Sequence, residues 1–457
     1  MRNDYVEILK TQKRELERLI SQPDLIERAQ LGWFEVNSTL AYFAVGVRRC
    51  GKSVLCRMAL AKSGFPFGYI DFDDEPLHDV QPEDLNDLLE AVYVVYGPVK
   101  HLFMDEIQDV PAWQLFVNRL LRQGMHIVIT GSNSRLLTDE RATHLTGRHI
   151  PVELTPFTFA EYRRYLGRGE AELAEGRAEA RRDYEAYAER GGFPETFRWV
   201  DVRNYYKSLY DSIVYRDILQ RHRIREVALF NRVARAMMEN YACQISANKL
   251  ARQLESNSPN TVQNFIHFME EAYLVYTVSL YGRKAWERTR IGKAYAVDPG
   301  FANYFTGYSP GDDRLGRRLE NIVYLQLRNK QHELDFEVYY YRDDRHEVDF
   351  LCQRRVRTMK LVQVCYDMPD EKTRNRELSA LFEIGAKFNC DDLVVVTDHE
   401  DGEVKHGKQT VRIVNVVAWL LEMDKERIRD DFFAKSREAA DEVRKAVAKR
   451  KAAKKDG

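Results

Sequence analysis

Three features that mark particular classes of protein are missing from this 457-residue sequence. It has no apolar run near the ~18 residues that span a bilayer, and its N-terminal stretch is a charged amphipathic pattern. Its six cysteines form no CxxC pair, which argues against a zinc site and for reduced thiols. Lys and Arg (70) almost balance Asp and Glu (71). We therefore expect a cytoplasmic protein without membrane contact and without overall attraction to nucleic acid.

What the sequence does contain is enough chain for several domains, with 44% hydrophobic and 31% charged residues and a mean hydropathy of −0.51. Between residues 38 and 155, short apolar runs alternate with helical segments. We expect strands over 39–45, 66–72, 99–105, 126–131 and 149–154, with helices beginning near Lys52, Pro82 and Pro111. This alternation predicts an α/β fold in which a parallel sheet has helices on both faces.

A phosphate-binding pattern lies between the first expected strand and the first expected helix. Gly46, four residues, and then Gly51-Lys52-Ser53 have the spacing of a P-loop. The glycines let successive backbone amides converge on an anion, and the helix adds its positive dipole end. Lys52 is predicted to reach the β- and γ-phosphates and the Ser53 hydroxyl to bind Mg²⁺, so we expect ATP and Mg²⁺ as ligands. The predicted nucleotide-binding residues of this loop are Gly46, Arg48, Arg49, Cys50, Gly51, Lys52, Ser53 and Val54.

Polar residues follow two further expected strands. Asp105 and Glu106 end the strand over 99–105, at the sheet edge where ligands bind in open α/β sheets. Asp105 is predicted to hold Mg²⁺ through water, and Glu106 to polarise the attacking water. Asn133, with Ser132 at the end of strand 126–131, is predicted to orient that water.

Arg148 precedes the fifth expected strand, in the stretch "LTGRHIPVEL". An arginine at this place is suited to reach a neighbouring subunit's nucleotide in a homo-oligomer and to stabilise charge on the γ-phosphoryl oxygens. The alternative is a structural arginine at the turn after Gly147.

Several stretches resemble the prokaryotic AAA-plus ATPases in which such a module is followed by a conserved C-terminal domain of unknown function. They are "GVRRCGKS", "YIDFDDE", "LFMDEIQDVPAW", "ITGSNSRLL", "LTGR", "ELTPFTFAEY", "GGFPE" and "YRDIL". The resemblance implies an ATPase core with a helical lid. In related signalling ATPases a Gly-x-Pro element of the lid contacts nucleotide, which would give Pro194 that role here. The residues alone indicate only a helix break and a turn.

The stretch over 246–293 resembles a winged helix, with a helix-turn-helix and then a hairpin wing. The second helix offers polar side chains that can read base edges, yet it has no Lys or Arg and carries Glu270 and Glu271. Contact with double-stranded DNA through the wing and a purely structural extension of the lid both remain open. The second helix presents Asn260, Gln263, Asn264 and His267, and the wing carries Arg283, Lys284, Arg288, Arg290 and Lys293.

The C-terminal part resembles the restriction-endonuclease-like (PD-(D/E)xK) core. Glu320 on a helix and Asp349 on a strand match two elements of that metal site, but Gln363-Val364-Cys365 stands where the Glu-x-Lys should be. Lys360 should point to the opposite face of its strand from Gln363. We therefore expect no cleavage activity.

Together these patterns predict five parts. They are a P-loop ATPase core over 1–155, a helical lid over 156–225, a winged-helix part over 226–293, a nuclease-like mixed α/β domain over 294–423 and a charged helical tail over 424–457. We expect an ATPase whose nucleotide state repositions the other parts. The alternatives are an ATPase that remodels DNA, a nucleotide-gated signalling scaffold with negligible turnover, and an ATP-dependent nuclease.

Overall fold

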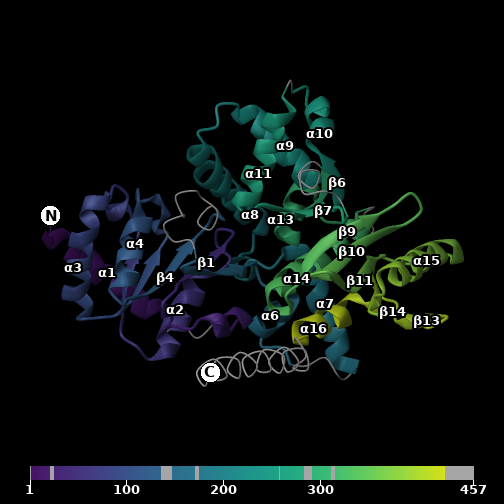
Figure 1. The fold of residues 1–457 in the computed structure, drawn as a ribbon, viewed down its shortest axis with the longest axis horizontal. Coiled ribbons are helices and arrows are strands. Elements are labelled where there is room, and N and C mark those ends of the chain that lie inside the picture. The colour runs from purple at the N-terminus through teal and green to yellow at the C-terminus, as the bar shows by residue number, and fades with distance from the viewer. Residues whose placement is uncertain are drawn as a thin grey trace, which may run out of the picture.

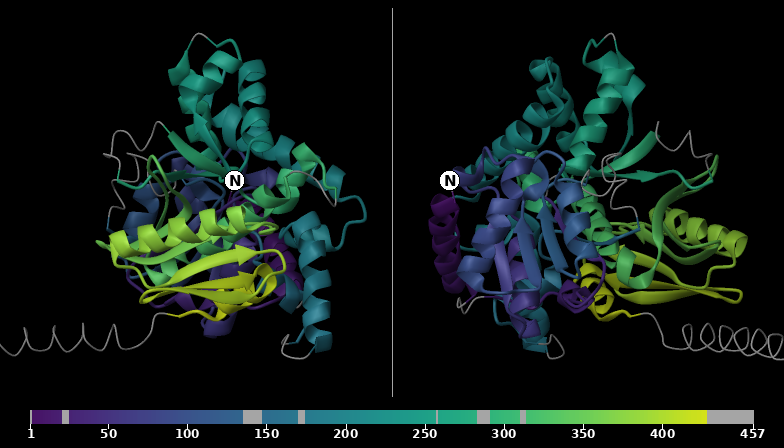
Figure 2. Two further views of the ribbon diagram at one scale, coloured as in Figure 1. Left: turned by 90° about the vertical axis from the view of Figure 1, so that its right-hand side faces the viewer. Right: turned by 60° about the vertical axis from the view of Figure 1, so that its left-hand side comes forward.

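The computed structural model of the protein describes residues 2–20, 25–134, 147–169, 174–256, 258–282, 291–309 and 314–427. Figure 1 shows three groups of elements: the N-terminal sheet and its helices (purple to blue), a mainly helical part (teal) and a C-terminal sheet (green to yellow). Figure 1 and Figure 2 show the N-terminal and C-terminal sheets on opposite sides of the molecule, with the helices of residues 227–271 above them and those of residues 159–190 lower down, beside the C-terminal sheet.

The N-terminal sheet has five parallel strands in the order β2-β3-β4-β1-β5. All residues of β1 and β3 are buried, and so are most residues of β4. This is typical of parallel strands covered on both faces. The five expected strands are confirmed, and the helices near Lys52, Pro82 and Pro111 are present. The strands are β1 (Ala41–Gly46), β2 (Phe67–Asp71), β3 (His101–Asp105), β4 (His126–Gly131) and β5 (His149–Leu154); the flanking helices are α1 (Arg2–Ile20), α2 (Lys52–Ser63), α3 (Leu85–Tyr96) and α4 (Trp113–Arg122).

The chain that follows the sheet is helical, as expected. A capping box begins its first helix, since the Thr158 hydroxyl accepts from the Glu161 amide and the Glu161 carboxylate accepts from the Thr158 amide. The last of these segments is a π-helix. This form is rare in proteins, and where it occurs it often lies at a functional site. The elements are α6 (Phe159–Tyr165), α7 (Ala174–Arg190), η6 (Pro194–Phe197), α8 (Val202–Ser212) and the π-helix η7 (Ile213–Gln220).

Four helices of the described residues and a three-stranded antiparallel sheet come next, with strand order β6-β8-β7. The sequence pattern over 226–283 predicts three helices and one strand, and the structure has two strands there, β6 and β7. Of the predicted wing residues, Lys293 lies on β8, while 283–290 are outside the described residues. The elements are α9 (Val227–Glu239), β6 (Cys243–Ser246), α10 (Ala247–Gln253), α11 (Pro259–Glu271), β7 (Val275–Ser279), β8 (Ile291–Ala296) and α13 (Pro299–Thr306).

The C-terminal sheet is mixed, with strand order β13-β14-β12-β11-β10-β9. Helix α15 packs against β10, β11, β12 and β14, and helices α14 and α16 pack on each other and on the sheet. Apolar runs at 337–342, 347–352, 360–366, 392–397 and 411–416 predict five strands, and β13 is an addition at the edge. The elements are α14 (Leu315–Leu334), β9 (Glu337–Arg342), β10 (Glu347–Arg354), β11 (Arg357–Val364), α15 (Glu371–Phe388), β12 (Leu393–Thr397), β13 (Gly402–His406), β14 (Gln409–Asn415) and α16 (Val416–Lys425).

One continuous apolar core connects the three groups of elements, from Leu9 in α1 to Met423 in α16. A smaller second cluster fills the space between α15 and the C-terminal sheet. All six cysteines are free thiols, as expected. Among the described helices, none combines the length and apolar character that a bilayer crossing requires.

Candidate functional site

The loop between β1 and α2 needs its two glycines. Gly46 has φ 145°, and a Cβ on it would lie 2.1 Å from the Leu154 carbonyl oxygen. Gly51 has φ 100°, a left-handed conformation that other residues rarely adopt. The loop therefore curls tightly against β5 and then reverses directly into the helix.

The N-terminus of α2 is open toward the same loop. The first amides of a helix have no acceptor within the helix, and in the described part of the chain no side chain caps this helix at Gly51. Such a helix end attracts anions through its amides and its dipole. The loop and the helix end together have the donors that a phosphate chain requires.

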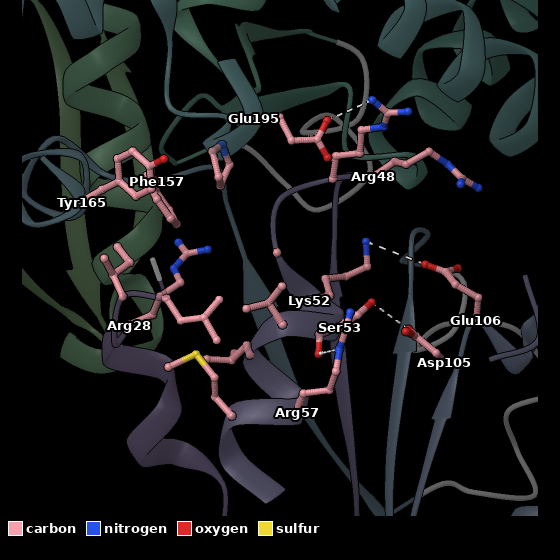
Figure 3. A pocket seen from close by; sticks show the side chains of 18 of the residues that line it. Arg28, Arg48, Lys52, Ser53, Arg57, Asp105, Glu106, Phe157, Tyr165 and Glu195 are labelled. Atoms are coloured by element: carbon pink, nitrogen blue, oxygen red, sulfur yellow. Dashed lines mark hydrogen bonds and ion pairs between the residues drawn. The ribbon is translucent and has the colours of Figure 1, made fainter. Parts of the chain in front are cut away.

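Lys52 lies inside this loop and is only 5% exposed. Its ammonium donates to the carbonyl oxygens of Gly46 and Val47, at 3.1 Å each. It also lies 3.9 Å from Glu106 Oε1 (Figure 3). One cation therefore connects the curled loop to the end of β3.

Oxygen donors suited to a hard cation lie beside the lysine. Ser53 Oγ donates to Asp105 Oδ1 at 2.9 Å, and the Thr130 hydroxyl donates to the same carboxylate oxygen. Among the described residues no three His, Cys, Asp or Glu side chains form a metal-holding group. A hydroxyl and a carboxylate fit Mg²⁺, which in phosphate sites takes only one or two protein ligands and completes its shell with phosphate and water oxygens.

Burial raises the pKa of two acids at this end of the sheet. Burial and the charge of Glu106 raise the pKa of Asp105. Asp71, which pairs with Asp105 in the register of β2 and β3, has its pKa raised to about 7 by burial and by Asp105. A bound cation would favour the ionised forms of both carboxyls.

Glu106 has the opposite shift. Burial raises its pKa, but the charges of Lys52 and Arg48 more than offset this, so the net shift is downward. Its Oε2 accepts from the Ser132 amide at 3.3 Å and from the Gln108 side-chain amide. Its φ of 54° is unusual for a non-glycine residue. Glu106 is thus an ionised carboxylate held in a fixed orientation at the end of β3.

A cavity of about 480 Å³ extends from these groups to a less polar end. There Arg28, Phe157 and Tyr165 lie across from Lys52 and Ser53 (Figure 3). The Arg28 guanidinium lies 5.2 Å from the Phe157 ring centroid and pairs with both oxygens of buried Glu161, at 2.8 and 2.9 Å. Leu25, Ile26 and Met58 supply apolar surface to the same cavity.

The predicted residues are distributed as follows. Those that line the cavity are Arg48, Arg49, Gly51, Lys52, Ser53, Val54, Asp105, Glu106 and Pro194. Gly46 and Cys50 lie buried in the loop behind it, and the Cys50 carbonyl accepts from Arg28 at 3.1 Å. Asn133 is buried just beyond β4 and does not line the cavity. Arg148 is exposed and also lies outside the cavity, and its guanidinium donates to Asn118 Oδ1 at 2.6 Å.

Sequence reasoning missed Asp71, Thr130, Arg28 and Asp217. Asp71 was within reach, since it ends an expected strand just as Asp105 does. Thr130 is an inward residue of β4, and nothing in its local sequence distinguishes it. Arg28 and Asp217 have partners far along the chain, at Glu161 and Arg48.

The second predicted site, in the C-terminal domain, contains a cation of its own. Lys293 Nζ from β8 lies 2.8 Å from Asp349 Oδ1, 3.2 Å from Glu320 Oε1 and 3.1 Å from Glu347 Oε1. Gln363 accepts from the Asp349 amide and donates to Glu377 on α15. Lys360 pairs instead with Glu426, which confirms that it points to the opposite face of β11.

The curled glycine loop, the buried lysine and the strand-end carboxylates define the class: a P-loop nucleotide-binding domain. Residues 38–163 match the AAA domain family, so the N-terminal part is an AAA-type ATPase domain. Residues 181–312 and 315–417 match two domain families of unknown function, DUF8612 and DUF4143.

The particular family follows from a relative. An uncharacterized protein of Methanocaldococcus jannaschii is 32% identical over 400 residues, covering 82% of this chain and 87% of that protein. The chain belongs to the same family as that protein. An uncharacterized protein of Haemophilus influenzae is 27% identical over 394 residues, covering 82% of this chain and 93% of its own.

Solved structures give weaker likenesses. The Walker-type ATPase PABY2304 of Pyrococcus abyssi has 17% identity and a TM-score of 0.42, covering 62% of this chain and 97% of its own. The branch migration motor RuvB of Thermotoga maritima has 16% identity and a TM-score of 0.28, covering 58% and 87%.

Proposed function

We propose that this protein binds ATP with Mg²⁺ and hydrolyses it slowly, and that its nucleotide state repositions the helical and C-terminal parts. One observation supports this most directly: Ser53 contacts Asp105 at 2.9 Å in the cavity where Lys52 lies 3.9 Å from Glu106. A phosphate-binding loop, a metal-binding pair and a base are thus assembled from β1, α2 and β3.

Each residue has a role that follows from its position. Lys52 and the amides at the start of α2 neutralise and orient the phosphates. Ser53 and Asp105 would hold Mg²⁺, which supplies charge neutralisation at the β- and γ-phosphates. Glu106 is ionised and accepts from the Ser132 amide, so it is placed to accept a proton from an attacking water.

The less polar end of the cavity is suited to the nucleoside. Phe157 and Tyr165 offer ring faces, and Leu25, Ile26 and Met58 offer apolar surface to a base. Arg28 is already paired with Glu161, so its guanidinium there is a neutralised, flat surface over Phe157.

The Gly192-Phe193-Pro194 segment gives a route from the cavity to the rest of the chain. Pro194 lines the cavity, and the Gly192 amide donates to Asp298 Oδ2 at 2.5 Å. Asp298 also caps α13 by accepting from the Phe301 amide at 3.0 Å. A movement of the lid at Pro194 would therefore be transmitted to the start of α13.

The test separates binding from turnover. Lys52→Ala is expected to abolish binding of a fluorescent ATP analogue, because it removes the buried ammonium that neutralises the phosphates. Glu106→Gln should keep binding and stop phosphate release, because the amide cannot accept the water's proton. Lys62→Ala, on the same helix but 62% exposed, is the matched control and should change neither property. Equal phosphate release by wild type and Glu106→Gln would remove Glu106 from this role.

DNA contact through the wing stays a prediction of the sequence, because 283–290 are outside the described residues. Within the described part, His267 on the exposed face of α11 lies 3.3 Å from Glu271 and 4.0 Å from Glu270. These carboxylates oppose the approach of DNA phosphates. Duplex binding at low salt is the direct measurement.

The nuclease-like reading of the C-terminal domain also remains a proposal, and we propose that it has no cleavage activity. The Lys293 ammonium lies within 3.2 Å of Glu320 and Asp349, where a metal ion would have to bind. It therefore neutralises the two acids that match elements of the nuclease metal site.

A further inference from the structure

The π-helix η7 contacts a residue of the nucleotide cavity through a buried carboxylate. Asp217 is 1% exposed. Its Oδ2 accepts from Arg48 Nε at 3.2 Å, and its Oδ1 accepts from Arg48 Nη2 at 3.4 Å and from Ser132 Oγ at 3.0 Å. Arg48 belongs to the phosphate-binding loop, and the Ser132 amide donates to Glu106. Asp217 therefore connects the phosphate-binding loop with the strand end that holds Glu106.

Further ion pairs join η7 to the N-terminal part, and they differ in whether their residues line the nucleotide cavity. Arg216 lies 3.3 Å from Asp73, which also pairs with Arg48 at 3.5 Å. Arg221 lies 3.2 Å from Asp109. Arg48 and Asp73 line the nucleotide cavity, whereas Arg221 and Asp109 do not. The same interface thus contains one pair that a ligand can reach and one that it cannot.

Arg48 has two competing uses. Its side chain is 18% exposed and lines the cavity together with Lys52 and Glu106 (Figure 3). A guanidinium there is suited to the oxygens of a phosphate chain. While it is paired with Asp217, much of its charge is neutralised by a carboxylate.

We propose that Asp217 competes with the phosphates of the nucleotide for Arg48, so that nucleotide binding loosens η7 from the N-terminal sheet. The inference rests on the proposed nucleotide binding and adds the residue through which the cavity acts on the helical part. Asp217 is a positioning residue, because it acts through Arg48 and Ser132.

The test compares substitutions with opposite expected signs. Asp217→Asn keeps the shape and removes the charge, so a non-hydrolysable ATP analogue should bind about tenfold more tightly, as for a charge-assisted hydrogen bond released to the ligand. Asp217→Glu restores the charge and should bind much like wild type. Arg48→Gln should weaken binding. A merely structural role for the pair would weaken binding in both Asp217→Asn and Arg48→Gln.

Asp109→Asn is the matched control, since it breaks an ion pair of the same interface outside the cavity, and its affinity should equal that of wild type. Adenosine without phosphates should bind wild type and Asp217→Asn alike.

The second readout is hydrogen exchange of residues 213–220, which should speed up in wild type when the analogue is added and should not respond in Arg48→Gln. Equal or weaker binding by Asp217→Asn, or exchange in wild type that the analogue leaves unchanged, overturns the inference. Failure of wild type to bind the analogue at all overturns the proposed function itself.

Discussion

Single carboxyl groups at the end of the N-terminal sheet differ in charge state because their neighbours differ. Burial raises the pKa of all three acids, but two nearby cations more than offset this at Glu106, whereas Asp105 raises the pKa of Asp71 further and Glu106 raises that of Asp105 further. The three acids lie at the ends of β2 and β3. The contrast follows the general rule that perturbed acids gather at functional sites.

Asp71 gives a prediction about pH. Its pKa is about 7 in the folded chain, against an ordinary value of 3.8, so between these two pH values the folded state holds a proton that the unfolded state has released. Stability should therefore fall as pH rises through that window, and the whole penalty is present above pH ~7. Asp71→Asn removes the penalty. The free energy of unfolding of the variant minus that of wild type should therefore rise by about 2 kcal/mol from pH ~5 to pH ~8.

Urea unfolding of ligand-free protein at the two pH values measures this difference. Asp79→Asn, at an exposed position after the same strand, is the control. It should change the free energy of unfolding by the same amount at both pH values. A constant difference between Asp71→Asn and wild type would show that Asp71 does not take up a proton in this range.

At the scale of elements, β8 joins the helical part to the C-terminal domain through Lys293. Burial lowers the pKa of this ammonium, but the charges of Asp349 and Glu320 more than offset this. The net shift is upward, so the ammonium stays charged. Burial and Asp349 raise the pKa of Glu320, whereas Lys293 lowers it. The lysine is therefore the counter-ion that allows these acids to be buried between β8, α14 and β10.

Lys293→Met should lower the free energy of unfolding by about 3 kcal/mol, because it leaves buried carboxylates without a partner. Lys360→Met is the matched control, because Lys360 also pairs with carboxylates but lies on the opposite face of β11 from Gln363. Its partners Glu426 and Asp392 are 39% and 43% exposed, so the loss should be about 1 kcal/mol or less. Urea unfolding followed by circular dichroism compares the two variants. Equal losses would contradict the role of Lys293 as a buried counter-ion.

At the scale of the whole molecule, Arg148 raises the question of assembly. It is exposed beside α4 and lies outside its own chain's cavity. We propose, as the sequence predicts, that it acts on the nucleotide of a neighbouring subunit. Arg148→Ala should then lower turnover by about 10³-fold and leave ATP binding intact.

Mixing variants tests the assembly directly. Lys52→Ala is expected not to bind ATP but retains Arg148, so adding it to Arg148→Ala should restore part of the turnover. Asn118→Ala removes the contact to Arg148 without removing the guanidinium and should keep turnover near wild type. No recovery in the mixture, together with a monomeric mass in solution, would assign Arg148 to its turn alone.

The N-terminal fold and much of the nucleotide site were predictable from the sequence. The pattern of glycines, Lys52 and Ser53 is local, and the apolar strand before Asp105 and Glu106 specifies where those acids emerge. In a parallel sheet the carboxyl ends of neighbouring strands share one edge, so local patterns were enough to bring these residues together.

Only the tertiary structure decided which charged residues pair across elements. Arg28 meets Glu161 across 133 positions, and Arg48 meets Asp217 across 169. Lys293, expected in a basic wing, is instead buried against Glu320 and Asp349. Hydrophobic periodicity determines which face of an element is buried, whereas the partner of a buried charge depends on how separate elements dock, and no short stretch of sequence records that.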